Sequence, residues 1–386
     1  MTKRPAPQDS KGDGGDATSS VQVDTAQRVQ DGAAWRDFCA ALAAAGDVIL
    51  RDGSPVDPLD RAEGFRYLSR LTRLALEKFV EHADPLHPSF YRLSHETAKI
   101  GCDNPDSFYQ NAEISGAQEY RLSGSRGSVA YLGFGTYYGA YGSFGRSGCS
   151  GYLEADELEI GPDGRFEIIL SRQRTEGNWL PMEDDTSMLI VRQNVLDREH
   201  ETLADLQLER LGEHRPPAPL SPTRLGEALD GAARFVTGTA SLFADWAEGF
   251  AAAPNTLAPM DPQRTGGAHG DPHIFFYMGY WALEPDQALL IELEPPECFY
   301  WNIQLNNHWM ESLDYRHHPV HLNKHSAHAR PDGSVQIVVA HTDPGVPNWL
   351  DTAGHTSGTL GLRWVKANTH PAPLTRVVKL SEVTSP

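Results

Sequence analysis

The sequence has few cysteines, and their placement excludes two common kinds of site. Only four occur among 386 residues, and they lie far apart, at Cys39, Cys102, Cys149 and Cys298. No two of them form a Cys-x-x-Cys pair, so neither a disulfide framework nor a cysteine-based zinc site is expected. We expect reduced, buried thiols.

Long apolar runs and an excess of positive charge are also absent. No stretch reaches the roughly 18 apolar residues that cross a bilayer, and the polar N-terminus has no apolar core of a signal peptide. Lys and Arg number 33 against 52 Asp and Glu, which gives a net charge of −19. Nucleic acids and anionic membranes need basic patches, so neither is expected as a partner. These absences predict a soluble, acidic, cytoplasmic protein.

The composition and the spacing of apolar residues along the chain predict five segments. Residues 1–30 are rich in Asp, Gly, Ser and Thr, which predicts a disordered tail. Residues 31–95 have apolar side chains at helical spacing, whereas 96–200 alternate short apolar strands with Gly and Asp turns. Helical periodicity returns over 201–265, and 266–386 return to strands. We therefore expect two β modules, preceded and joined by helices.

Ordered landmarks recur in the two β segments and indicate an internal duplication. Each segment has an Asp-Gly turn, an Asn-Trp-Leu tripeptide, a Thr-Ser pair and an apolar strand that ends in Arg. In chain order these are Asp163, Asn178, Thr186 and Arg192 in the first segment, and Asp332, Asn348, Thr356 and Arg363 in the second. One shared tripeptide would be noise, but four landmarks in the same order at near-equal spacing indicate two copies of one module.

A further pair of matching segments stands at the beginning of the two copies, one in each. Asn104-Pro105-Asp106-Ser107-Phe108-Tyr109 matches Asp271-Pro272-His273-Ile274-Phe275-Phe276-Tyr277, with one residue inserted. This match places Asp106 and His273 at corresponding positions, each just before an aromatic strand. Each side chain could line the cavity of its module or serve as a turn group.

The predicted fold class is mainly β with helical additions (α+β). Short strands between Gly and Asp turns, without a strand–helix–strand rhythm inside either copy, favour two tandem antiparallel β-sandwich or jelly-roll-like modules. Helices are expected at the N-terminus and between the modules. A Rossmann fold is excluded because Gly133, Gly135 and Gly139 have the wrong spacing and no helix pattern follows them.

The Asn104–Tyr109 segment, the two Asn-Trp-Leu segments and the strand Phe299-Tyr300-Trp301-Asn302-Ile303-Gln304-Leu305 carry a family likeness. Together they resemble the bacterial domains of unknown function 1254 and 1214. The part from about residue 279 to 378 looks most like the 1214 type, and the earlier module looks like a shorter relative of the 1254 type. The resemblance implies a tandem β-sandwich and supplies no reaction. Family members usually have Tyr/Trp-Ser-Leu-x-Leu-Tyr-Asp where this chain reads YWNIQLNNHW, which suggests a different pocket lining.

One short segment gathers the side chains that suit acid–base chemistry. It places carboxylates, a cation, a phenol and an imidazole close together in sequence, a mixture that can shift a pKa toward neutrality and move a proton. The candidate catalytic residues are Glu311, Asp314, Tyr315, Arg316 and His317. A salt-bridged turn is the alternative.

Neighbouring polar and aromatic positions are candidates for substrate binding. In the strand from Tyr300 to Leu305, polar uncharged residues alternate with apolar ones, as expected where one face lines a wet pocket. The candidate substrate-binding residues are Asn302, Gln304, His308, Trp309, His273, Tyr277, Asp106 and Tyr109.

The many histidines after residue 307 raise the alternative of a metal site. On a strand rising about 3.3 Å per residue, His317 and His321 lie about 13 Å apart, too far to share one ion. Pro319 between them disfavours a helix that would bring them together. No P-loop, HExxH, kinase or G-x-S-x-G signature occurs. We therefore expect no cofactor and no metal ligands.

The leading hypothesis is an enzyme that acts by proton transfer, as a lyase, hydratase or hydrolase, on a small and largely apolar or aromatic organic molecule. Glu311, Asp314 or His317 would be the acid or base, and Arg316 would orient an anionic group. The competing hypothesis is a non-catalytic ligand-binding or assembly module, and a weaker one is a histidine-ligated metalloenzyme. A homo-oligomer is left open.

Overall fold

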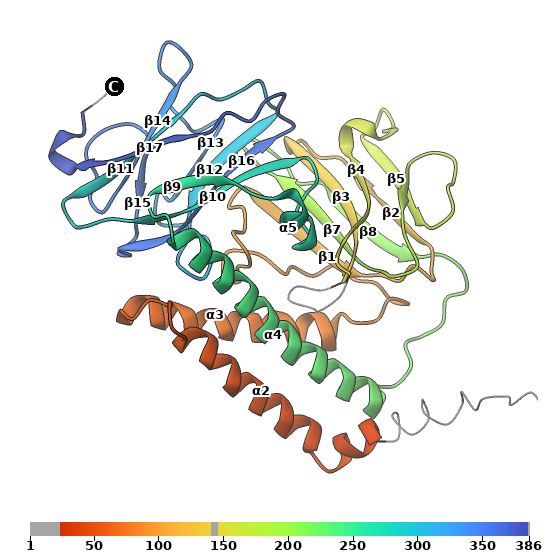
Figure 1. The fold of residues 1–386 in the computed structure, drawn as a ribbon. Coiled ribbons are helices and arrows are strands. Elements are labelled where there is room, and N and C mark those ends of the chain that lie inside the picture. Colours follow the sequence, from red (N-terminus) through yellow and green to blue (C-terminus); the bar gives the residue numbers. More distant parts are fainter. Residues whose placement is uncertain (1–23, 140–145, 385–386) are drawn as a thin grey trace, which may run out of the picture.

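The structure is a computed structural model that describes residues 24–139 and 146–384. Three long helices, α2 (Ala33–Leu50), α3 (Pro58–Leu76) and α4 (Pro222–Ala251), pack against one another. Figure 1 shows them below two β modules that lie side by side. No helix in the described ranges combines the length and apolar character needed to cross a membrane.

The helix ends follow from local sequence. The side chain of Asp57 accepts hydrogen bonds from the backbone N–H groups of Leu59 and Asp60, with Pro58 in the first turn. Ser221 caps α4 in the same way, since its hydroxyl accepts from the backbone N–H of Arg224 before the first-turn proline. Helix α3 continues into a π-helical turn, η1 (Glu77–Glu81).

Each β module has eight strands. The first has β1 (Ser107–Glu113), β2 (Tyr120–Ser125), β3 (Tyr131–Tyr138), β4 (Gly148–Glu154), β5 (Arg165–Ser171), β6 (Trp179–Pro181), β7 (Thr186–Asn194) and β8 (Asp205–Arg210). The second has β10 (Ile274–Ala282), β11 (Gln287–Leu293), β12 (Tyr300–Leu305), β13 (His321–Asn323), β14 (Val335–Ala340), β15 (Trp349–Asp351), β16 (Ser357–Val365) and β17 (Leu374–Lys379). The short strand β9 (Thr256–Pro259) and helix α5 (Pro262–Gly267) lead into the second module.

The two modules have the same strand connectivity. In the first, one sheet has the order β1-β7-β3-β4 and the other β6-β5-β2-β8. In the second, the corresponding orders are β10-β16-β12-β13, extended by β9 beyond β10, and β15-β14-β11-β17. Strand for strand, each element of one module has a counterpart at the same place in the other. The predicted tandem β-sandwich architecture is confirmed, and the fold class is α+β with strands dominant.

The Asn-Trp-Leu repeats have the same structural role in both copies. Each tripeptide enters a three-residue strand that pairs in parallel with its neighbour, β6 with β5 and β15 with β14, in sheets that are otherwise antiparallel. The side-chain amide of Asn178 donates to the carbonyls of Glu159 and Glu167. That of Asn348 donates to the carbonyls of His328 and Gln336. Both asparagines therefore fasten a loop to a strand.

Two expectations about segment boundaries were wrong. The helical connection predicted from residue 201 begins with a strand, because β8 pairs with β2 along its whole length and completes the first module. The leucines of β8 alternate with polar residues and face the sandwich core. In a segment this short, such spacing can be mistaken for the spacing of a helix. Residues 24–30, assigned to the disordered tail, are helical, and residues 1–23 of that tail lie outside the described residues.

Three large apolar cores hold the molecule together. Each sandwich has its own core between its two sheets, represented by Phe134 and Ile168 in the first module and by Trp301 and Ile337 in the second. The third core lies between the helices and the outer faces of the sheets, and Met278 is one of its strand residues. Helix α4 contacts β10 and β16 of the second module.

Candidate functional site

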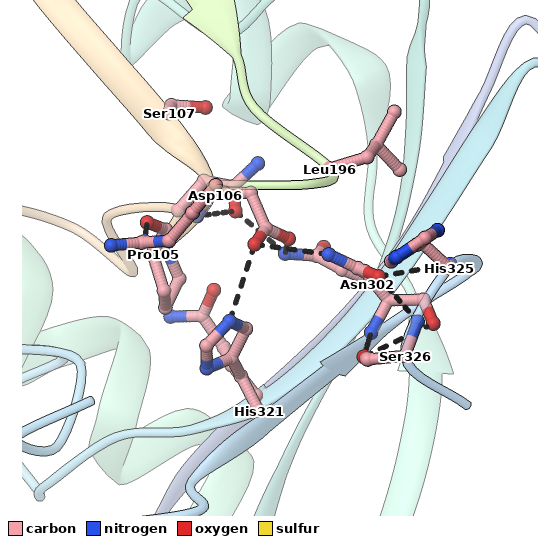
Figure 2. A network of polar contacts seen from close by, with 12 residues as sticks. Pro105, Asp106, Ser107, Leu196, Asn302, His321, His325 and Ser326 are labelled. Carbon is pink, nitrogen blue, oxygen red and sulfur yellow. Dashed lines mark hydrogen bonds and ion pairs between the residues drawn. The ribbon is translucent and has the colours of Figure 1, made fainter. Parts of the chain in front are cut away.

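The two modules dock through matching segments, beginning with Asp106 at the start of β1. Its carboxylate accepts hydrogen bonds from the Tyr300 hydroxyl at 2.5 Å, Asn323 Nδ2 at 3.1 Å and His321 Nε2 at 3.2 Å, all in the second module. Figure 2 shows Asp106 pointing toward Asn302 and His321. Burial alone would raise the pKa of Asp106, but these donors outweigh burial and lower it. The carboxylate is therefore a charged contact between modules.

The corresponding segment of the second module makes the reverse contact. Asp271 accepts hydrogen bonds from the hydroxyls of Tyr131, at 2.7 Å, and Tyr152. His273, two residues later, pairs through Nδ1 with Glu154 of β4. Tyr131 and Tyr300 are equivalent by strand register. Tyr131 pairs with Asn194, the last residue of β7, and Tyr300 pairs with Val365, the last residue of the corresponding strand β16.

Reciprocal contacts between equivalent surfaces define an approximately two-fold arrangement. Tyr131, Tyr300 and Val365 are buried together in a small apolar cluster where the modules meet. The rotation axis that relates the modules therefore passes near this cluster. Equivalent residues that face the axis come close together even though they are separated by about half the chain.

A cavity of about 110 Å³ opens at this interface. Its walls come from β1, β7, β10 and β16, from the segment before β1, and from the segment between α5 and β10. Apolar contributions include Ile100, Ile190 and Phe276. The most polar parts of the lining are Arg192 of β7 and Arg363 of β16, the two arginines that close the repeated apolar strands.

Both arginines are buried, with exposed fractions of 8% for Arg192 and 3% for Arg363. Arg192 donates to the Tyr137 hydroxyl at 2.8 Å and to the His269 carbonyl at 2.5 Å. Arg363 donates to Gln304 Oε1 at 2.7 Å, to Asn302 Oδ1 at 3.2 Å and to the Cys102 carbonyl. All of these acceptors are uncharged.

Neither guanidinium forms an ion pair with a carboxylate in the part of the chain that the structure describes. A buried cation held only by neutral acceptors carries a desolvation cost that an anion would offset. Arginine presents a planar fork of N–H donors that suits a carboxylate. The cavity can therefore hold a small anion.

Two carboxyl groups and an imidazole also line this cavity. Asp103 accepts from the backbone N–H and the hydroxyl of Ser312, and burial raises the pKa of its carboxyl, while the nearby Lys99 opposes the rise. Asp271 is the carboxylate that holds the two tyrosines of the first module. Burial lowers the pKa of His269 to about 4, so this imidazole is neutral near pH 7.

The predicted catalytic segment lies away from this cavity, and its five residues do not converge. Glu311 is fully buried and forms an ion pair with Arg70 of α3 at 2.5 Å, while Asn307 donates to its other oxygen. Burial raises the pKa of Glu311, and Arg70 opposes the rise. This carboxylate fastens the second module to the helices.

The remaining members of that segment face different surroundings. Asp314 pairs with the exposed Arg316 at 2.8 Å and lines a separate polar pocket. Tyr315 is half-buried, with the Lys99 ammonium 4.9 Å from its ring centroid. His317 is exposed to solvent. The hydrogen bond from Arg316 lowers the pKa of Asp314, so this carboxylate is ionised and poorly suited to donate a proton.

The predicted substrate-binding residues divide into two groups. Tyr109 lines the cavity, and Asn302 and Gln304 hold Arg363 beside it. The others make contacts that support the fold. These are Asp106 and His273 at the module contacts, His308 beside the Tyr280 hydroxyl, Trp309 donating to the Asp60 carbonyl, and Tyr277 donating to the His370 carbonyl.

Within the described ranges, no three His, Cys, Asp or Glu side chains are grouped so that they could hold a metal ion. The histidines after residue 307 are dispersed. His318 pairs with Asp351, His321 with Asp106, and His325 lies beside Asp197.

Sequence reasoning used Arg192 and Arg363 as landmarks of the repeat but did not identify them as site residues. A signal was present, because a charged residue recurs at the same place in an otherwise apolar, buried strand of both copies. An arginine in such a strand needs a polar partner or a ligand. The repeat also implied that the two arginines could meet wherever the modules dock symmetrically.

Comparisons with known proteins place this architecture in a family. The model described as "Protein of unknown function (DUF1214)" matches residues 283–368, which confirms the predicted 1214-type C-terminal part. The likeness of the earlier module to the 1254 type stays a prediction. No curated protein matches the chain.

Two solved structures are similar to the chain. A protein from Vibrio parahaemolyticus has 12% identity and a TM-score of 0.46, with 82% of this chain and 98% of that chain covered. An uncharacterized protein from Burkholderia cenocepacia has 52% identity and a TM-score of 0.91, with 93% of this chain and 100% of that chain covered. At this identity and coverage, the chain belongs to the same family of unknown function as the Burkholderia cenocepacia protein.

Proposed function

We propose that this protein binds a small organic anion in the cavity between its two modules. The observation that carries the proposal is the pair of repeat-equivalent arginines, Arg192 and Arg363, which line one cavity and have only uncharged acceptors. The carboxylate of a ligand would supply the missing negative charge. The uncharged side chains that hold each guanidinium fix its orientation in advance, which lowers the entropic cost of binding.

The same cavity favours proton transfer as a second candidate function, as a lyase, hydratase or hydrolase. Asp103 lines the cavity, is buried, and has a raised pKa. A buried carboxyl group with a raised pKa is a suitable general acid or base. The acid–base role would then fall to Asp103 rather than to Glu311 or His317, and the anion site would orient the substrate.

Calorimetric titration of the purified protein with a panel of small carboxylates tests the binding proposal. Arg192→Gln and Arg363→Gln should each abolish binding, because each removes one buried cation from the cavity. Arg70→Gln is the matched control, since it also removes a buried arginine, but one that lies outside this cavity and is paired with Glu311. Binding that survives in both cavity variants would overturn the proposal.

Two further variants extend this test. If the glutamine variants fold poorly, Arg192→Lys and Arg363→Lys keep the charge but lose the two-pronged donor geometry, and they should weaken carboxylate binding. Asp103→Asn separates binding from turnover. It should leave affinity for a carboxylate intact and abolish product formation if Asp103 is the acid. The prediction of a cytoplasmic protein stands beside this proposal and is checked by cell fractionation.

A further inference from the structure

A second, apolar chamber adjoins the arginine cavity. Its volume is about 70 Å³, and it lies between helix α4 and strand β10. It shares six wall residues with the cavity, Ile100, Gly101, Cys102, Ala268, Gly270 and Phe276. The two spaces therefore share a wall of small and apolar residues, and a ligand that occupies both would have to pass along this wall.

The far wall of this chamber is built from large apolar side chains. Phe243 and Trp246 of α4 pack edge to face with ring centroids 5.5 Å apart, and Met278 of β10 completes the wall. All three are buried. Thr265 is the main polar side chain added by this wall. The chamber thus offers aromatic and thioether surface to an apolar group, with little to satisfy a polar one.

About one anionic group would balance the charges that line the arginine cavity. Arg192 and Arg363 bring two positive charges, and Asp271 brings one negative charge. Asp103 is held by the backbone and hydroxyl donors of Ser312 beside the buried Lys99, whose positive charge offsets that of the carboxylate. A single carboxylate would therefore bring the site close to neutrality, whereas a dianion would leave an excess negative charge in a buried place.

Size limits the apolar group. A dry cavity of about 150 Å³ lined by apolar side chains holds a benzene ring. The chamber, of about 70 Å³, is about half that size, so it suits a short branched chain or the outer part of a ring, while the arginine cavity, of about 110 Å³, would hold the carboxylate and the rest of the molecule. A fatty acid or a sugar acid exceeds this space or lacks the apolar group.

We propose that the ligand is a monocarboxylate whose carboxylate lies at Arg192 and Arg363 and whose compact apolar group, an aromatic ring or short branched chain, reaches into the chamber between α4 and β10. This inference rests on the proposed anion site and adds the class of ligand. Helix α4 then determines specificity through Phe243 and Trp246.

Four probes test the inference by calorimetric titration of the full-length protein. Benzoate has both groups, acetate has only the carboxylate, benzamide has the ring without the charge, and succinate has two carboxylates. Benzoate should bind about ten- to a hundred-fold more tightly than acetate, as expected for burying a ring. Benzamide and succinate should bind at least ten-fold more weakly than benzoate.

Matched variants locate the ring. Ala268→Leu fills the shared wall and should weaken benzoate at least ten-fold more than it weakens acetate. Ala258→Leu makes the same change on the exposed face of β9 and should affect neither. If Ala268→Leu fails to fold, Phe243→Leu enlarges the chamber, so that 4-methylbenzoate should gain affinity relative to benzoate. Phe235→Leu, on the same helix outside the chamber, should not change that ratio.

The outcomes separate the inference from the proposed function. If benzoate, acetate and succinate bind alike, or if Ala268→Leu and Phe243→Leu leave the ligand preference unchanged, the inference is overturned and the anion site stands. If none of the carboxylates binds the wild-type protein, the proposed anion site falls and the inference falls with it.

Discussion

Two buried histidines should make the protein less stable in mild acid. Burial lowers the pKa of both His269 and His308 to about 4, from an ordinary value of 6.5. Between these values the unfolded chain binds a proton at each histidine and the folded chain does not. The free energy of unfolding therefore decreases as the pH falls from 6.5 toward 4 and is unaffected by these groups above that window.

The linkage relation gives the magnitude. For a histidine that titrates at 6.5 when unfolded and near 4 when folded, moving from pH 7 to pH 5 costs about 2 kcal/mol of stability. Both rings are almost completely buried, so solvent screening reduces the figure little. Together the two histidines should cost about 4 kcal/mol, a large fraction of the stability of an ordinary domain.

Urea denaturation at pH 7, 6 and 5 measures this effect, and a substitution isolates one histidine. His308→Gln removes the group that lies 3.0 Å from the Tyr280 hydroxyl, and it should reduce the loss between pH 7 and pH 5 by about 2 kcal/mol. His317→Gln, at an exposed position, is the control and should leave the loss unchanged. If His308→Gln loses as much stability on acidification as the wild type, the reasoning is refuted.

Three further predictions concern contacts that hold the modules and helices together. Asp106→Ala should destabilise the protein by about 2–4 kcal/mol in urea denaturation, because several buried donors lose their acceptor; a change below about 1 kcal/mol would contradict its role at the interface. Glu311→Gln should lower the free energy of unfolding by about 3–5 kcal/mol, because Arg70 loses its buried partner. Unchanged stability together with lost turnover would favour a catalytic role instead. Asn178→Ala and Asn348→Ala should both lower the melting temperature, since each removes the same set of loop hydrogen bonds. Asn348→Ala should lower it more, because Asn348 has a left-handed backbone with a φ of 60°, and equal effects would contradict this reasoning.

The sequence predicted the architecture well because the repeat supplied independent evidence for each element. The two Asn-Trp-Leu segments occupy the same place in both sandwiches. Strand β8 was misread because a short run of alternating leucines fits both periods. Its identity as a strand depends on pairing with β2, which lies some 80 residues earlier in the chain.

The candidate site was harder to predict because it is formed between modules. Glu311 and His317 are neighbours in sequence, yet the turn between them sends one side chain toward α3 and leaves the other in solvent. Arg192 and Arg363 are far apart in sequence, and only the docking of the modules places both on one cavity. Sequence proximity is a poor guide to a site on the axis between two repeats, because closeness there is decided by tertiary contacts.

The reciprocal docking has a consequence for how such a cavity can diverge. If two identical chains met in this way, every substitution would occur on both sides of the axis, so the cavity could only be symmetric. With both copies on one polypeptide, each side changes independently. Here Asp106 in the first copy corresponds to His273 in the second, and Tyr109 corresponds to Phe276. Covalent fusion thus allows a site with two unlike ends to form from two copies of the same surface, and such a site can distinguish the ends of an asymmetric molecule.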